Sequence, residues 1–220
     1  MPIAEKYLAD FEEETTYHVY NRTNNGELLF RSDENMRYFL SKYYQHTHHF
    51  LDTWCWCLLP NHFHLLANVK SATSIKQHLR GKELQQLTIT ERKFLKDEIT
   101  LSELIEHVFK RFFQSYALAF NKQHERKGNL FYKPFKRIRI ETDDQFLQAV
   151  IYIHANAVKH GLTNDLTSYK WSSLHSVLSS APTGLLRNEL LDIFGGKERF
   201  IKIHNEKTDY YYNVEAAIED

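Results

Sequence analysis

Two strand-like runs that lie only two residues apart constrain the fold more than any other feature of the sequence. Residues 51–59 and 62–69 are both apolar and rich in strand-forming residues, and only Pro60 and Asn61 separate them. A connection of two residues joins neighbouring antiparallel strands in a tight hairpin. We therefore expect an antiparallel sheet that contains this hairpin.

Signals for a strand and a helix precede the hairpin. Residues 15–21 are β-branched and aromatic, which predicts a first strand. Apolar residues at helical spacing, with Ser32 as the N-cap, predict a helix over about 33–48. After the hairpin, residues 70–100 are polar and their pattern is ambiguous.

Two capping boxes mark the starts of two further helices. A box that begins at Thr100 opens an apolar stripe that runs to about Asn121, and a box that begins at Thr142 opens a helix that Gly161 can end. Between these helices, arginine alternates with isoleucine in residues 135–140. This alternation predicts a half-buried strand with one basic face.

The predicted order of elements is strand, helix, hairpin, helix, strand, helix. This order indicates the α+β class, with a ferredoxin-like antiparallel sheet of about four to five strands and helices packed on it. We expect residues 15–164 to form the main domain, with 70–100 as an insertion. Residues 1–14 would form an acidic N-terminal extension, and residues 165–220 a helical C-terminal appendage.

Charge is balanced over the whole chain but not along it. Lys plus Arg and Asp plus Glu each number 28, whereas residues 122–139 hold seven basic residues and one acidic residue. The longest apolar run, residues 54–59, is far shorter than the ~20 residues that span a bilayer. Glu5 and Asp10 interrupt the N-terminus where a signal peptide would be apolar. We expect a cytoplasmic, nucleoid-associated protein without membrane contact.

A His-x-His pair lies in the second strand of the predicted hairpin. His62 and His64 flank Phe63, so the two-residue period of a strand directs both imidazoles to one face. Such a pair among 13 histidines also fits ordinary hydrogen-bonded or exposed side chains. The pair indicates a metal site only if other polar groups meet it.

The helix predicted after Thr142 has one apolar side, and Tyr152 falls nearly opposite that side. Asn156 lies one turn after Tyr152, close enough for both side chains to act at one site. Taken alone, Tyr152 fits an ordinary surface tyrosine better than a catalytic residue. The polar face that contains Tyr152 also includes Gln145, Gln148, Asn156 and Lys159.

The basic segment interleaves cations with aromatic residues such as Tyr132. This mixture can follow a phosphate backbone and stack unpaired bases. It also fits a solvated edge strand whose charges prevent aggregation. The candidates for contact with the DNA backbone are Arg126, Lys127, Lys133, Lys136, Arg137 and Arg139.

Three stretches, YHVYNR, LLPNHFHLL and YIHANAVKHGL, together resemble the REP-associated tyrosine transposases and the wider family of single-tyrosine HUH transposases. The resemblance covers roughly residues 15–176. NHFH followed by YIHAN carries its specificity. The chain departs from the family at Ala157, where proline is common, and in the length of segment 70–100. The resemblance also takes in GELLFRSDEN, YALAFNKQH, GNLFYKPFK and YKWSSLHS.

The resemblance implies a metal-dependent single-strand DNA endonuclease and strand transferase. In such an enzyme His62, His64 and Asn156 would hold Mg²⁺ or Mn²⁺, and Tyr152 would be the nucleophile that forms a covalent 5′-phosphotyrosine. The implied partner is single-stranded or hairpin DNA. The sequence does not distinguish a monomer from a dimer.

Two other functions remain open at this point. Cys55 and Cys57, with His62 and His64, supply the ligand types of a structural zinc site, and a two-residue turn would place Cys57 opposite His64. The chain would then be a zinc-stabilised, non-catalytic DNA-binding protein. Alternatively, it would keep the transposase fold and bind DNA repeats without moving any element.

Overall fold

The computed structural model describes residues 7–213, with side chains as far as Lys207 except that of Asn25. Its centre is one antiparallel sheet of four strands in the order β2-β3-β1-β4. This strand order with crossing helices is that of a ferredoxin-like layout, so the predicted α+β class is confirmed. The strands are β1 (Thr16–Arg22), β2 (Leu51–Leu59), β3 (His62–Val69) and β4 (Lys136–Arg139).

The hairpin of β2 and β3 forms as predicted. Leu59 pairs with His62 across the two-residue turn, and Cys57 pairs with His64 two positions further on. A bulge between Thr53 and Cys55 shifts the register toward the other end of the hairpin. The register around the His-x-His pair is therefore regular, which keeps both imidazoles on one face of the sheet.

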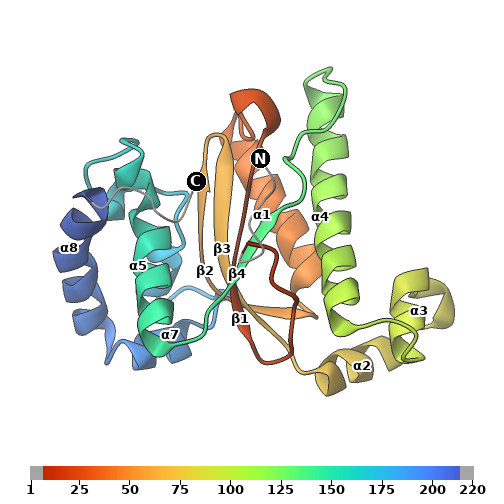
Figure 1. Cartoon of the computed structure of the whole chain (residues 1–220). Helices are drawn as coiled ribbons and strands as arrows, with labels where there is room; N and C mark the ends of the chain where they lie inside the picture. Colours follow the sequence, from red (N-terminus) through yellow and green to blue (C-terminus); the bar gives the residue numbers. More distant parts are fainter. Residues whose placement is uncertain (1–6, 214–220) are drawn as a thin grey trace.

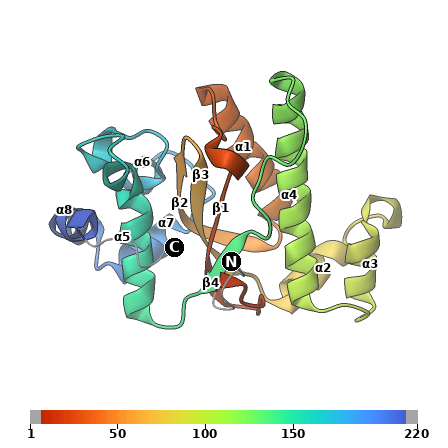
Figure 2. The same cartoon turned by 45° about the horizontal axis from the view of Figure 1, so that its top comes forward.

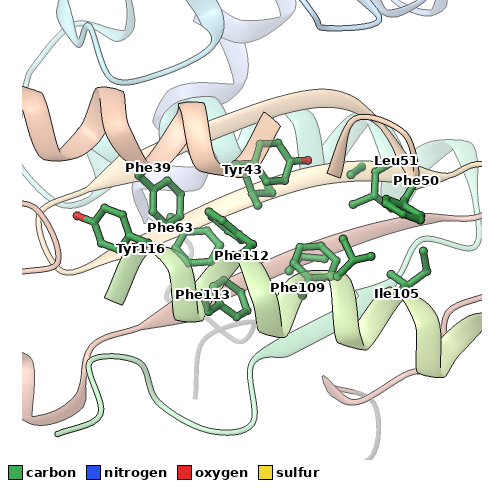
Figure 3. Close-up of a cluster of buried hydrophobic side chains, with 14 of the residues drawn as sticks. Phe39, Tyr43, Phe50, Leu51, Phe63, Ile105, Phe109, Phe112, Phe113 and Tyr116 are labelled. Carbon is green, nitrogen blue, oxygen red and sulfur yellow. The ribbon is translucent and has the colours of Figure 1, made fainter. Parts of the chain in front are cut away.

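Two long helices cover one face of the sheet, α1 (Asp33–Thr47) and α4 (Leu101–Gln123). Both start at the expected caps, because the Ser32 hydroxyl accepts from the backbone N–H of Asn35 and Thr100 forms a capping box with Glu103. Closely packed aromatic rings fill the space between these helices and the sheet (Figure 3). This core packs α1 and α4 against the sheet.

The segment between β3 and α4 is helical rather than a loop. It contains α2 (Ala72–Arg80), η3 (Leu84–Gln86) and α3 (Ile89–Leu95), which lie at one end of α4 (Figures 1 and 2). A few apolar side chains, Ile75, Leu79, Leu87 and Phe94, join the main core. So few anchors in a polar segment explain why its pattern was ambiguous.

The opposite face of the sheet is covered by α5 (Asp143–Lys159), which lies between the sheet and α8 (Lys197–Asn213) (Figure 1). Gly161, with a φ of 66°, ends α5 as expected. The Leu162 N–H bonds to the Ala157 carbonyl and the Gly161 N–H to that of Val158, which is a Schellman cap.

The C-terminal residues up to 213 pack on α5 and also contact β2. The Leu58 N–H donates to the Trp171 carbonyl, and the Leu186 N–H donates to the Thr53 carbonyl. This part of the chain therefore covers the sheet together with α5. The remaining short helices are η2 (Asn24–Gly26), η4 (Leu166–Ser168), α6 (Leu174–Leu178) and α7 (Arg187–Ile193).

The described part of the acidic N-terminal segment, residues 7–14, packs against the body of the protein. Phe11 is 3% exposed and belongs to the main core. Arg137 of β4 donates to the Ala9 carbonyl at 2.7 Å. Residues 1–6, like 214–220 of the expected C-terminal appendage, lie outside the described residues. No helix within the described range is both long and apolar enough to cross a membrane.

Candidate active site

The two histidines of the His-x-His pair face α5. His64 is fully buried, and its ring centroid lies 5.7 Å from that of Tyr152 on α5. The His62 ring lies 4.8 Å from that of His160, just beyond the end of α5. The sheet and one side of this helix therefore bring the predicted metal ligands and the predicted nucleophile together.

Tyr152, Asn156 and His160 are spaced four residues apart and form a stripe along α5. The sequence placed Tyr152 opposite the apolar side, which would fit a surface tyrosine. Instead, Tyr152 is only 6% exposed and Asn156 is fully buried. The reason is that α5 is covered twice: α8 packs against it from outside, while its polar stripe meets the histidines of the sheet.

Neighbours fix the orientation of both imidazoles through their Nδ1 atoms. The Nδ1 of His62 lies 2.7 Å from the side-chain oxygen of Asn61, which can only accept, so this Nδ1 donates and Nε2 carries the lone pair. The Nδ1 of His64 lies 2.9 Å from the Nε2 of His18 on β1. Metal-binding histidines are typically held in this way through the nitrogen that does not bind the metal.

Asn156 provides the test of whether a cation fits. Its Nδ2 donates to the Tyr152 carbonyl at 3.2 Å, while its Oδ1 is buried and has no hydrogen-bond partner among the described residues. Leaving such an oxygen without a partner costs about 1–3 kcal/mol. Two imidazoles and one amide oxygen suit a divalent ion, so the residues present fit Mg²⁺ or Mn²⁺.

Lys159 lies at the hydroxyl of Tyr152. Its Nζ donates to the Tyr152 Oη at 3.4 Å and lies 5.0 Å from the centroid of the ring. An ammonium group in this position stabilises negative charge that develops on the phenol oxygen. The arrangement favours a tyrosine that acts as a nucleophile or leaving group.

The alternative zinc site is not formed. Cys57 lies opposite His64 as the register requires, but both cysteines are buried in the apolar cluster between the sheet and α5. Burial raises the pKa of the Cys55 and Cys57 thiols, which disfavours the thiolates that zinc needs. Within residues 7–213, no group of three or more His, Cys, Asp or Glu side chains is arranged to hold a metal ion.

The basic side chains of β4 lie on both faces of the sheet. Arg137 is buried on the α4 side, where it pairs with Glu106 and donates to the Ala9 carbonyl. Lys136 points to the opposite face, that of the histidines, and is half-buried there. The two-residue period of a strand enforces this separation. Arg137 of the predicted basic face therefore makes a structural contact, and Lys136 is the β4 cation that lies on the side of the histidines.

The other predicted DNA contacts have different surroundings. Arg126 forms a bidentate ion pair with Glu27, at 2.5 and 3.0 Å, and connects the loop after α4 to the segment between η2 and α1. Arg139 pairs with Glu12 at 2.6 Å on the surface. Lys127 and Lys133 are exposed. Arg126 and Arg137 are thus both engaged in ion pairs with glutamates of the same chain.

The sequence did not single out His18 and Tyr20 as site residues. They alternate on β1 as His62 and His64 do on β3, and His18 lies 5.9 Å from Tyr152 between ring centroids. His18 is 4% exposed and Tyr20 is 8% exposed. The same two-residue period in the quoted stretch YHVYNR was the signal that could have identified them.

A pocket of about 280 Å³ opens beside the histidines. His62 and His64 form part of its wall, and Lys136 of β4 forms another part. Asn61, His160, the end of β1 and segment 130–135 complete it. The pocket gives a ligand access to the His-x-His pair from outside.

No family model matches the sequence, and neither does any curated protein. A search of solved structures finds a REP-associated tyrosine transposase bound to a REP hairpin. It is 17% identical, the alignment covers 83% of this chain and 89% of that chain, and the TM-score is 0.49. At these values the likeness is one of general layout, so the chemistry of the site rests on its own residues.

Proposed function

We propose that the protein is a metal-dependent single-strand DNA endonuclease and strand transferase, a transposase of the single-tyrosine HUH type. The observation that carries this proposal is that the ring centroids of Tyr152 and His64 lie 5.7 Å apart, with the buried and unpaired Oδ1 of Asn156 one helical turn after Tyr152. A nucleophile, two imidazoles and an amide oxygen in one place are the parts that this reaction requires.

In the proposed reaction the Oη of Tyr152 attacks phosphorus while the bond from phosphorus to the 3′ oxygen breaks. The phenol loses its proton, the leaving oxygen gains one as a 3′-hydroxyl, and the 5′ phosphate remains on Tyr152. Lys159 stabilises the phenol oxygen when it attacks and when it leaves. The ester keeps the reactivity of the original bond, so a second 3′-hydroxyl can reverse the step without ATP.

His62, His64 and Asn156 are the residues that would hold Mg²⁺ or Mn²⁺. The chemistry supplied by a divalent ion held there is the neutralisation and orientation of a phosphoryl oxygen. His18 and Asn61 then act on the two imidazoles, keeping an Nε2 lone pair on each. The substrate proposed is single-stranded or hairpin DNA, because unpaired bases can stack on aromatic side chains near the site.

The proposal is tested with labelled oligonucleotides drawn from repeats that flank the protein's own gene, incubated with Mn²⁺ and separated on a denaturing gel. A label at the 3′ end should move with the protein, whereas a label at the 5′ end should leave with the released fragment. Tyr152→Phe and a chelator should each abolish the adduct, while Tyr38→Phe, a change at an exposed tyrosine of α1, should not. Binding of the same DNA without any adduct would make the protein a non-catalytic DNA-binding protein.

A further inference from the structure

The pocket beside the histidines contains an exposed tyrosine whose backbone is held at both ends. The Tyr132 N–H donates to the Arg22 carbonyl at 2.9 Å, and the Tyr132 carbonyl accepts from the Asn21 Nδ2 at 3.1 Å. The residue nevertheless remains 41% exposed. A ring that is anchored by its backbone and still open to solvent can bind a flat ligand at a small entropic cost.

A guanidinium group lies over this ring. The Arg22 Cζ is 5.6 Å from the centroid of Tyr132, and Arg22 itself is exposed at the end of β1. Arginine planes and tyrosine rings are the side chains on which unpaired bases stack. We name the pair Arg22 and Tyr132 the stacking pair.

A cation lies in the same pocket as the stacking pair. Lys136 pairs with Tyr20 in the register of β1 and β4, and its Nζ lies 5.6 Å from the centroid of the Tyr20 ring. It lies 4.6 Å from the ring of Tyr7 as well. Two aromatic rings thus hold this ammonium group at the wall of the pocket, where it can meet a phosphate.

We propose that this pocket is a subsite for one unpaired nucleotide of DNA. The base stacks on the stacking pair and the adjoining phosphate meets Lys136, which leads the backbone toward His62 and His64. A base that is paired in a duplex cannot enter such a pocket without leaving its stack, so the subsite selects single-stranded DNA. This inference rests on the proposed function for the reaction that follows, but DNA binding in the pocket can be measured without it.

A DNA strand bound in the pocket could leave it along a neighbouring groove. Asn21, Tyr132 and Pro134 line the pocket and also a larger groove of about 920 Å³ that runs along α4. These three residues, Tyr132 among them, therefore lie where the pocket and the groove meet. The nucleotide on the stacking pair would be the first one inside the site.

The test compares hexathymidylate with the same six-nucleotide backbone that lacks all bases, in the Tyr152→Phe background, by fluorescence anisotropy. We define the base ratio as the affinity for hexathymidylate divided by the affinity for the base-free backbone. We expect this ratio to be roughly 5 to 150, the range for stacking of one base. Tyr132→Leu should reduce this ratio to near one, and Tyr132→Phe should restore it. The matched control is Tyr38→Leu on α1, because Tyr38 is 40% exposed and has Lys42 at 5.3 Å from its ring centroid.

The inference is overturned if hexathymidylate does not bind, or if Tyr132→Leu changes the ratio no more than Tyr38→Leu does. A normal thermal unfolding curve for Tyr132→Leu excludes misfolding as the cause of a lost ratio. Formation of the Tyr152 adduct is read separately. An adduct without a Tyr132-dependent ratio removes only the subsite, whereas a Tyr132-dependent ratio without an adduct keeps the subsite and removes the nuclease.

Discussion

Histidines lie on both sides of α5, and the two sides differ in how fully their buried polar groups are hydrogen-bonded. On the side of α8, the Nδ1 of His204 donates to the Phe200 carbonyl at 2.8 Å, so its Nε2 accepts from the Nδ1 of His154 at 2.9 Å. The Nε2 of His154 in turn accepts from the Ser173 hydroxyl at 2.9 Å. All four ring nitrogens of this pair have partners within the chain.

The side of α5 that faces the sheet is not closed in this way. There the Asn156 Oδ1 is buried without a hydrogen-bond partner among the described residues, and the pocket beside His62 and His64 reaches the surface. Folding alone favours the first arrangement, because a buried polar atom without a partner lowers stability. This contrast is expected if the first side stabilises the fold and if the second side binds a cation, as we propose.

The largest expected effect is a loss of protein stability in acid, caused by the His154 and His204 pair on the α8 side of α5. We call this the closed side. Burial lowers the pKa of His204 to about 4 and that of His154 well below its ordinary value, so both rings are neutral in the folded protein. An unfolded histidine titrates near 6.5, so the unfolded chain binds more protons below that pH and stability falls as the pH drops. For His204 alone the loss should reach about 3 kcal/mol near pH 4.

Urea unfolding at pH 7.5 and pH 5 measures this loss. The double variant His154→Leu/His204→Leu should lose less stability between the two pH values than the wild type does. If both proteins lose the same amount, the closed side is not the source of the acid sensitivity.

Leucine substitutions on the two sides should act in opposite directions. His154→Leu leaves the Ser173 O–H and the His204 Nε2 without their buried partner and should lower the free energy of unfolding by about 2–3 kcal/mol. Asn156→Leu removes the unpaired oxygen, so it should raise the stability of the metal-free protein by about 1 kcal/mol and weaken Mn²⁺ binding. Denaturant unfolding and calorimetric titration with Mn²⁺ give the two numbers. Loss of stability in Asn156→Leu would show that the oxygen is satisfied after all.

His18 should contribute through His64 rather than by touching the substrate. His18→Leu removes the group that fixes the His64 Nδ1 and should weaken Mn²⁺ binding about 10- to 100-fold. His18→Gln should recover part of this affinity, because its amide oxygen can accept from that Nδ1. Equal affinities for the two variants would refute an orienting role.

The smallest expected effect is a change in the salt dependence of DNA binding, which should differ between Lys136 and Arg137 on β4. Lys136→Met should reduce the slope of log K for DNA against log salt by about one, because one phosphate contact is lost. Arg137→Met should leave that slope unchanged and lower stability, since Arg137 is buried and pairs with Glu106. Binding measured at several salt concentrations distinguishes the two. The assignment fails if Arg137→Met changes the slope as much as Lys136→Met does.

Local patterns in the sequence predicted much of the fold. The hairpin, α1, α4 and α5 follow from two-residue and helical periods and from caps at Ser32, Thr100 and Thr142, all of which are interactions between near neighbours. The helices between β3 and α4 were missed because a few apolar anchors in a polar segment acquire meaning only through their packing on α4.

The site was predictable only in part. Its members on β3 and α5 have distinctive spacings, and the structure brings these two elements together, while their chemical roles stay a prediction. The burial of Tyr152 and the bond from His18 to His64 depend on contacts between distant segments, which no local pattern reveals. For the same reason the sequence did not separate Arg137, which is held by Glu106, from Lys136.

The most direct test of the central claim is to locate the covalent bond. The protein is incubated with Mn²⁺ and the cleavable oligonucleotide, the adduct is digested with protease and nuclease, and the modified peptide is sequenced by mass spectrometry. We predict a phosphonucleotide on Tyr152, one of 13 tyrosines in the chain, joined through the 5′ phosphate. A modification on any other residue would contradict the proposed mechanism.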